Sequence, residues 1–329
     1  MEGFPARRMR RYRRRIVQEL FTGTCLQVSD LIAPLFVEEG IDRPVPIDSM
    51  PGLVRHPVGD LPSVARRLRD LGLPSVLLFG IPAAKDPEAS SAFAPDGVIQ
   101  RSVRAMKEEA PDLLVCTDVC ACEYTDHGHC GIVGETRGEQ DLLNDPSLEL
   151  MNRIAVSHAE AGADIVAPSC MLDGMVGSIR EALDGSGFQD VLIMSYSSKF
   201  ASGFYGPFRE AADSGYSFGD RTTYQLNPAN AREAIRESAL DAGEGADILM
   251  VKPAGYYLDI LAALRKFGLP LAAFQVSGEY AMIRAAAERG WIDERSAVME
   301  SLTCIKRAGA DLVITYFAEM AAEWANEEQ

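Results

Sequence analysis

The segment GADILMVKPAG, residues 245–255, combines the features that decide the fold. A glycine that can end a helix is followed by an aspartate, by the rest of the apolar run Asp247–Lys252, and then by Pro253. The same Gly-Ala-Asp triplet occurs at 162–164 and 309–311, each time between a segment of helical character and an apolar run. The spacings of 83 and 64 residues are too irregular for a solenoid but suit a barrel with unequal loops.

Eight such apolar runs occur along the chain, with longer helical segments between them. The runs are continuous rather than alternating, as in parallel strands that are covered on both faces. Eight strand–helix units favour closure, so we predict an α/β fold: one (β/α)8 (TIM) barrel over 31–329, preceded by an extended arm over 1–30. The alternative is an open doubly wound sheet, which needs a glycine-rich turn after the first strand, where the chain instead has Val37-Glu38-Glu39-Gly40.

The predicted strands are Leu31–Phe36, Ser75–Phe79, Leu113–Asp118, Asp164–Pro168, Val191–Ser195, Asp247–Lys252, Leu271–Val276 and Asp311–Tyr316. The predicted helices are 60–71, 97–109, 146–161, 174–184, 228–242, 258–267 and 279–289. For the helix over 228–242 we expect Asn227 as the N-cap and Gly243 as the stop.

The formal net charge of −16 is spread unevenly over the 329 residues. Seven arginines between Arg7 and Arg15 stand against Glu2, so the first 15 residues carry +6 and the remainder carries −22. An acidic body argues against nucleic acid as the main partner, because phosphate binding needs a basic face. The arginine run has three interpretations, in descending order: a solvated arm, an arm packed on a neighbouring subunit, and a nucleic-acid or localisation patch.

Neither a membrane span nor a secretory signal is expected, because the apolar stretches are short and none follows the basic N-terminus. The chain has seven cysteines, an odd number. Without an export signal we expect a cytoplasmic protein, whose reduced thiols serve metals or catalysis.

Two lysines lie at predicted strand ends. Lys252 terminates an apolar run, where desolvation would lower its pKa and free the amine as a nucleophile; a lysine that extends to the rim is an equal alternative. Lys199 lies among Tyr196, Phe200 and Tyr205, and taken alone it is an ordinary loop lysine. At neighbouring barrel mouths, however, each ammonium would destabilise the other. We therefore expect at least one neutral amine, able to form a Schiff base with a carbonyl.

A cysteine cluster follows the third predicted strand, in the segment 118–130 (DVCACEYTDHGHC). The thiolates of Cys120, Cys122 and Cys130 would suit zinc, and three protein ligands leave its fourth position open. The alternatives are a closed site completed by a histidine of the same segment, and a disulfide. Cys116 is predicted to be a core residue.

The remaining polar candidates lie at strand ends or around the aperiodic segment 196–227, which we predict to be a lid or binding element. Guanidinium groups suit the binding of carboxylates, although a surface salt bridge is the alternative for each single arginine. These candidates are Asp118, Ser169, Ser277, Tyr316, Arg209, Arg221 and Gln225.

With these motifs the chain resembles the porphobilinogen synthase (5-aminolevulinate dehydratase) family over nearly its whole length. The resemblance implies that two 5-aminolevulinate molecules condense to porphobilinogen with loss of two waters, in tetrapyrrole biosynthesis. The matching stretches are DVCACEYTDHGHCG at 118–131, MSYSSKFASGFYGPFRE at 194–210, GDRTTYQLNP at 219–228, MVKPAGYYLDI at 250–260, FQVSGEYAMI at 274–283 and SLTCIKRAGADLVITYF at 301–317.

The resemblance also implies roles for individual residues. Lys252 matches the lysine that forms the Schiff base with the A-side substrate, and Lys199 matches the lysine that holds the P-side substrate. Asp118 matches an acid beside the metal. The metal ligands would be Cys120, Cys122 and Cys130 for catalytic zinc; the substrate contacts would be Arg209, Arg221, Tyr205, Phe208 and Gln225 on the A side, and Ser277 and Tyr316 on the P side, with Ser169 near by.

Outside the reaction site, Glu237 matches an allosteric magnesium site, and the resemblance implies a homo-octamer assembled through the arm. Cys170 and Met175 stand where many relatives have an aspartate and a polar or basic residue, which bears on subunit contacts and metal response. A class I aldolase is the nearest rival enzyme, but it needs one imine-forming lysine and no zinc. A zinc-dependent nucleic-acid-binding protein would have to bind through the arm alone.

Overall fold

The sheet closes into a barrel of parallel strands, and this confirms the predicted (β/α)8 fold. The computed structural model describes residues 8–136 and 138–327. Each barrel strand pairs with the next one along the chain, and the last pairs with the first through Leu31 and Val313. The barrel strands are β1 (Leu31–Glu38), β4 (Ser75–Ile81), β5 (Leu114–Val119), β8 (Ile165–Pro168), β9 (Leu192–Lys199), β10 (Ile248–Lys252), β11 (Leu271–Gln275) and β12 (Leu312–Thr315).

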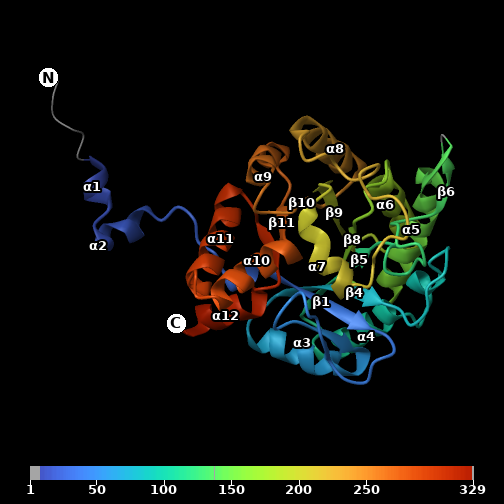
Figure 1. Cartoon of the computed structure of the whole chain (residues 1–329), viewed down its shortest axis with the longest axis horizontal. Coiled ribbons are helices and arrows are strands. Elements are labelled where there is room, and N and C mark those ends of the chain that lie inside the picture. Colours follow the sequence, from blue (N-terminus) through green and yellow to red (C-terminus); the bar gives the residue numbers. More distant parts are fainter. Residues whose placement is uncertain (1–7, 137, 328–329) are drawn as a thin grey trace.

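Helices surround the barrel on its outside (Figure 1). All seven predicted helices are present, as α3 (Leu61–Asp70), α4 (Val98–Glu109), α5 (Asn144–Glu160), α6 (Met175–Gly185), α8 (Ala231–Glu244), α9 (Leu258–Leu264) and α10 (Ser277–Glu288). The structure adds α11 (Glu294–Ala308) and α12 (Ala318–Glu327). The sequence carried a signal for α11, because its buried residues Val298, Leu302 and Ile305 recur at helical spacing.

The Gly-Ala-Asp triplets have one structural role at all three positions. Their glycines have φ between 102° and 127°, a region that favours glycine, and so end the preceding helices. Each aspartate then accepts a backbone hydrogen bond from the start of the preceding barrel strand. The pairs are Asp164 with the N–H of Val115 at 2.7 Å, Asp247 with that of Ile193 at 2.8 Å, and Asp311 with that of Leu271 at 2.9 Å. The triplet therefore couples the end of a helix to the register of the barrel.

The predicted boundaries of α8 were wrong at both ends. Asn230, not Asn227, is the N-cap, and its side chain accepts a backbone N–H of the first turn. Asn227 instead stabilises the turn before the helix with its own side-chain oxygen. Gly243 lies inside the helix, and Gly245, in the left-handed conformation, ends it. The two asparagines offer the same capping chemistry, so local sequence does not separate them.

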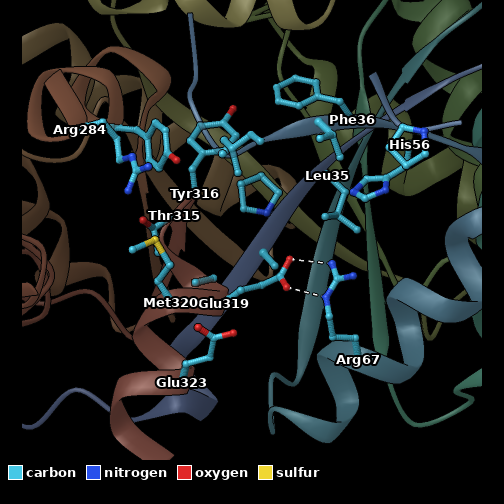
Figure 2. A pocket seen from close by; sticks show the side chains of 18 residues that line it. Leu35, Phe36, His56, Arg67, Arg284, Thr315, Tyr316, Glu319, Met320 and Glu323 are labelled. Carbon is cyan, nitrogen blue, oxygen red and sulfur yellow. Dashed lines mark hydrogen bonds and ion pairs between the residues drawn. The ribbon is translucent and has the colours of Figure 1, made fainter. Parts of the chain in front are cut away.

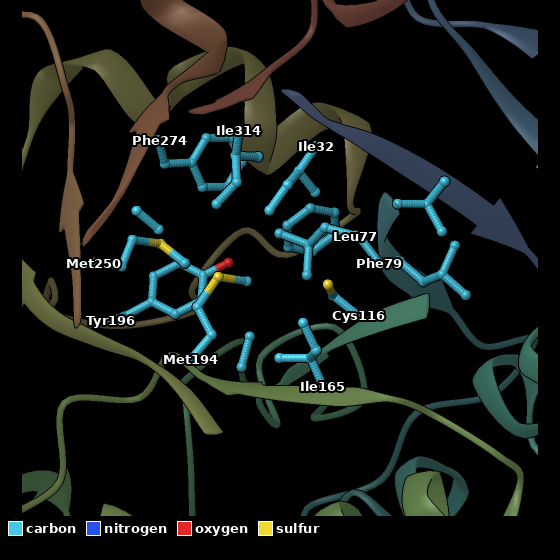
Figure 3. Close-up of a cluster of buried hydrophobic side chains, with 14 of the residues drawn as sticks. Ile32, Leu77, Phe79, Cys116, Ile165, Met194, Tyr196, Met250, Phe274 and Ile314 are labelled. Carbon is cyan, nitrogen blue, oxygen red and sulfur yellow. The ribbon is translucent and has the colours of Figure 1, made fainter. Parts of the chain in front are cut away.

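Apolar side chains from several strands fill the barrel interior (Figure 3). Ile32, Leu77 and Ile314 are fully buried there, and so is Cys116, which confirms it as a core residue. The burial of these apolar side chains supplies most of the driving force for folding. Because this interior is filled, no open channel runs through the barrel, and the polar side chains at the carboxyl ends of the strands face its mouth.

The short helices α1 (Arg8–Tyr12) and α2 (Arg15–Gln18) lie away from the barrel (Figure 1). Ile16 on α2, and Leu20 and Phe21 in the turn that follows it, are 80%, 78% and 61% exposed. Arg7, at the start of the predicted arginine run, lies outside the described residues. Among those residues, no helix is both long and apolar enough to cross a bilayer.

Candidate active site

Lys199 and Lys252 meet at the mouth of the barrel. They are the last residues of β9 and β10, and their Cα atoms are partners in the parallel ladder. β9 is longer than predicted, which makes Lys199 a strand residue rather than a loop residue. Both amines face the ring of Tyr196, with Nζ 5.5 Å (Lys199) and 5.0 Å (Lys252) from its centroid. Both side chains are buried.

The two amines differ in their electrostatic surroundings. Burial and the neighbouring charge of Lys199 lower the pKa of Lys252 to about 7. Burial also lowers the pKa of Lys199, but the opposing effect of Cys130, Cys120 and Asp118 is larger, so its pKa is raised. The Lys199 Nζ also donates to the carbonyl of Ser169 at 2.6 Å. Lys252 is therefore the amine that is available in neutral form near pH 7.

Asp118 lies on β5, between the lysines and the cysteine cluster. One of its oxygens accepts a hydrogen bond from the Ser169 hydroxyl at 3.1 Å, and the other has no partner within the described chain. Burial raises the pKa of Asp118, against the opposing effect of Lys199 and Lys252. A buried carboxyl group with a free oxygen beside two amines can accept and return a proton.

The three predicted zinc ligands converge in the loop after β5. The Sγ atoms of Cys120, Cys122 and Cys130 all lie within 4.8 Å of one another. Hydrogen bonds from Cys120 and Cys122 lower the pKa of Cys130 well below its usual value. All seven cysteines are free, which argues against the disulfide alternative. Three clustered thiols, one of them readily ionised, fit a soft divalent metal such as zinc.

The neighbouring histidine does not close the cluster. The ring nitrogens of His129 lie 3.1 Å from the hydroxyl of Tyr224 and 3.1 Å from the carbonyl of Phe218. His129 therefore joins the cysteine loop to the segment after β9. This arrangement favours the open three-thiolate site over a four-ligand site that uses this histidine.

Glu123 is a site residue that the sequence analysis missed. Its side chain is buried and accepts a hydrogen bond from the Cys122 thiol at 3.3 Å. Burial, followed by the charge of Asp118, raises its pKa to about 7. Its position in Cys-Ala-Cys-Glu was the available signal, since a carboxyl group beside a cysteine can share a hydrogen bond with its sulfur.

The segment after β9 covers Lys252. It contains the short helix α7 (Gly206–Ala211), and the Lys252 Nζ lies 5.0 Å from the ring of Phe208, as well as 4.2 Å from that of Phe274 on β11. Tyr205 fixes the segment by donating from its hydroxyl to the carbonyl of Phe200 at 2.8 Å. Ser277 holds it from the other side, because its hydroxyl accepts from the backbone N–H of Phe208 at 3.0 Å. The predicted lid is thus closed over the amine.

The two predicted arginines lie in or beside this lid. Arg221 is buried, and one of its nitrogens donates to the carbonyls of Gly128 (2.9 Å) and Ser214 (3.0 Å). The Arg209 guanidinium lies over the ring of Tyr216, 5.2 Å from the centroid. Three nitrogen donors here are still free to bind a ligand: among the described residues, the Nε atoms of both arginines and the Nε2 of Gln225 have no hydrogen-bond partner. These groups suit an anionic ligand.

Tyr316 separates the site from a side cavity. Its ring stacks on Phe36 at 5.9 Å between centroids, and its buried hydroxyl has no partner in the described chain. Tyr316 also lines a cavity of about 460 Å³ between β1 and β12, which contains the ion pair of Arg67 and Glu319 (Figure 2). Neither lysine lines this cavity.

Glu237 lies apart from the lysines, on α8. It lines a cavity of about 310 Å³ together with Asn144 and Asp173. Burial raises its pKa to about 7, and the negative charges of Asp241 and Asp173 add to the effect. A cation bound beside Glu237 would stabilise its charged form and so offset the cost of burying it near other carboxylates.

Comparisons with a family model and with known proteins indicate the same family, and the matches extend over nearly the whole chain. The family model described as delta-aminolevulinic acid dehydratase matches residues 6–324. A protein of that name from Methanothermobacter thermautotrophicus is 56% identical over 319 residues, covering 96% of both chains. Another from Escherichia coli is 52% identical over 308 residues, covering 93% of this chain and 94% of the other.

A solved structure agrees as well. Delta-aminolevulinic acid dehydratase (porphobilinogen synthase) from Toxoplasma gondii, in complex with the reaction product porphobilinogen, superposes with a TM-score of 0.95 at 44% identity. The match covers 100% of this chain and 94% of the other.

Proposed function

The chain belongs to the delta-aminolevulinic acid dehydratase family, and we therefore propose that it condenses two molecules of 5-aminolevulinate to porphobilinogen. It is a lyase of tetrapyrrole biosynthesis, built on a (β/α)8 barrel. The observation that carries this function is the pairing of Lys199 with Lys252 across adjacent strand ends, beside three clustered thiols.

Lys252 is the amine that attacks the ketone of the A-side substrate. With a pKa of about 7 it is substantially neutral at physiological pH, and a neutral amine is the nucleophile for imine formation. Lys199, whose pKa is raised, must lose a proton before it attacks the ketone of the P-side substrate. Asp118, near both amines and with one unpartnered oxygen, is the acceptor for that proton.

Cys120, Cys122 and Cys130 hold a zinc ion in this proposal. When bound, zinc supplies a Lewis acid with an open position for a substrate oxygen or amine. Glu123 accepts a hydrogen bond from the Cys122 thiol, and Arg221 donates to the carbonyl of Gly128, which connects the cysteine loop to the lid. The seven free thiols suit a reducing compartment, and we assign the enzyme to the cytoplasm.

Lid residues bind the substrates and exclude water. Arg209, Arg221 and Gln225 direct unpartnered nitrogens that suit the A-side carboxylate. Tyr205 and Phe208 cover Lys252 and would protect its imine from hydrolysis. On the P side, Ser277 and the hydroxyl of Tyr316 contact the second carboxylate, with Ser169 near by.

We also propose that the chain assembles into a homo-oligomer and that it binds a regulatory metal ion away from the lysines. The exposed apolar side chains of Ile16, Leu20 and Phe21 on the arm would be buried against a second copy of the chain, in a homo-oligomer that we expect to be an octamer. Glu237, with Asp173 and Asn144 in its cavity, suits an allosteric magnesium ion, since magnesium prefers oxygen ligands.

The direct test combines a turnover assay with chemical trapping. We expect the purified protein to form porphobilinogen from 5-aminolevulinate, and borohydride reduction in the presence of substrate to add mass to Lys252. The control is Lys266→Arg, at an exposed lysine that lies over Phe267. Full activity without any modification of Lys252 would contradict the proposed chemistry, and absence of turnover in metal-replete protein would contradict the function.

A further inference from the structure

Strand β9 contains one residue more than its pairing with β10 requires. Ser195 pairs with Leu249, and Ser198 pairs with Val251, so three steps along β9 match two steps along β10. This irregularity is a β-bulge, which changes the direction of the side chains that follow it. The bulge ends one residue before Lys199.

The bulge brings the two amines to one face of the sheet. In a regular strand, successive side chains alternate between the faces, and paired residues of neighbouring strands share a face. Counted in regular register from Ser195, Lys252 would lie opposite Ser198. Lys199 would then point away from the barrel interior. With the extra residue, Lys199 is instead the partner of Lys252, and its Nζ faces the ring of Tyr196.

Helix α8 contacts both sides of the bulge. The Ser195 hydroxyl donates to the carboxylate of Asp241 at 2.5 Å. The hydroxyl oxygens of Ser198 and Ser238 lie 2.9 Å apart. The Ser238 hydroxyl carries one proton, and its shortest contact with a carbonyl is to Ala234 at 2.9 Å, so Ser198 is the donor in the serine pair. The two β9 serines are three residues apart and both face α8, which a regular strand does not allow.

The four side chains of this clamp (Ser195, Ser198, Ser238 and Asp241) are all buried, and the last two serines are 0% exposed. A buried hydroxyl or carboxylate costs free energy unless it is hydrogen-bonded, so loss of either contact would leave polar groups unpaired. In the regular register Ser198 would turn from α8 towards the barrel interior. The clamp therefore disfavours that register and stabilises the bulge.

We propose that Ser238 and Asp241 are positioning residues that hold the bulge in β9 and thereby keep Lys199 beside Lys252. Each acts on Lys199 through a serine of β9. The inference rests on the proposed function, in which both amines act on substrate. Because the reacting groups must be aligned, a displacement of about 1 Å can lower the rate about 100-fold.

The test is the double variant Ser198→Ala/Ser238→Ala, which removes both hydroxyls of one contact. Removal of both partners leaves neither of them unpaired and costs little stability, so the variant should fold. We expect the kcat for porphobilinogen to fall by about tenfold or more, because Lys199 is no longer held in place. The charge of Lys199 contributes to the lowered pKa of Lys252. The pH midpoint of borohydride trapping at Lys252 should therefore rise by about half a unit or more.

The matched control is Ser102→Ala, at another fully buried serine, whose hydroxyl donates to the carbonyl of Val98 at 2.6 Å within α4. Its kcat and its trapping midpoint should match those of the parent. The inference fails if the double variant keeps the kcat of the parent. It also fails if kcat falls while the midpoint stays unchanged, because the two amines have then not separated.

If the double variant folds poorly by circular dichroism, Ser198→Ala alone takes its place, since it keeps the bond of Ser238 to Ala234. The same two readouts then decide. Trapping needs one imine and no condensation. Failure of the parent protein to form porphobilinogen would therefore reject the proposed function, while the difference in midpoint between parent and variant would still test the clamp.

Discussion

Replacing Lys199 with methionine tests the origin of the lowered pKa of Lys252. Burial is the first cause of that lowering and the charge of Lys199 is the second. Methionine removes the charge but keeps an unbranched side chain in the buried position. The variant cannot complete the condensation, but it retains Lys252 and can still form one imine.

The expected shift follows from the pairing of the two strands. Neighbouring strands lie about 4.8 Å apart, and the two lysines are Cα partners. Two unit charges about 5 Å apart repel by about 3 kcal/mol at an effective dielectric constant of about 20. This corresponds to about two pKa units. The negative charges near Lys199 offset part of its effect, so we expect the pKa of Lys252 to rise by about one to two units.

The sign of the pH dependence is set by which form reacts. The neutral amine attacks, and a lysine with a pKa of about 7 is about 10% neutral near pH 6 and about 90% neutral near pH 8. In the parent protein, the rate of borohydride trapping at Lys252 should therefore rise through pH 7. In Lys199→Met the same rise should occur at about pH 8–9.

The assay is mass spectrometry of Lys252 after brief reduction with borohydride in the presence of 5-aminolevulinate, over a series of pH values. Lys199→Arg keeps the charge and should leave the midpoint near 7. An unchanged midpoint in Lys199→Met would refute the electrostatic coupling of the two amines. A shift to lower pH would show that Lys199 acts on Lys252 with the opposite sign.

Four further outcomes are expected. Cys130→Ser should lose bound zinc by elemental analysis and at least about 100-fold of activity, because it removes one of the three proposed ligands. The circular dichroism spectrum should stay unchanged, because serine has nearly the same size and shape as cysteine. Retained activity in verified metal-free protein would contradict this. Deleting residues 1–22 should lower the mass of the particle in light scattering, and an unchanged mass would exclude the arm as an oligomer contact. Glu237→Gln should abolish any stimulation of turnover by magnesium while the activity without magnesium remains; stimulation equal to that of the parent would place the ion elsewhere. Asp247→Ala should lower the free energy of unfolding in urea by about 1–3 kcal/mol, because the buried N–H of Ile193 loses its acceptor. A loss below about 0.5 kcal/mol would show that the aspartate of the Gly-Ala-Asp triplet does not stabilise the barrel register.

Much of the fold could be predicted because its signals are local. Each barrel strand is a short apolar run, and each of the three triplets places a helix-ending glycine directly before a strand-opening aspartate. The error at α8 also comes from reliance on local signals, because two neighbouring residues offered the same one. Asn227 and Asn230 lie three residues apart with equal capping chemistry, and only the path of the chain decides which one caps.

The candidate site was predictable where its residues follow a strand directly. Lys252 and Cys120 lie at or just past strand ends, and a parallel barrel gathers its strand ends at one mouth. Glu123 was missed although its place in Cys-Ala-Cys-Glu was a local signal, because only the folded chain buries it. Ser238 was missed because Ser198, with which it shares a hydrogen bond, lies 40 residues away in the chain.

The sequence by itself determined the barrel, the pair of lysines and the three-thiol cluster, because each strand is a local apolar run and these residues directly follow or end such runs. Tertiary structure alone decided which amine is neutral. Both lysines are equally buried, but Lys199 lies near the cysteine cluster and its readily ionised Cys130, and Lys252 lies among aromatic rings. The energy of a charge depends on distances between residues far apart in sequence, and folding is what sets those distances.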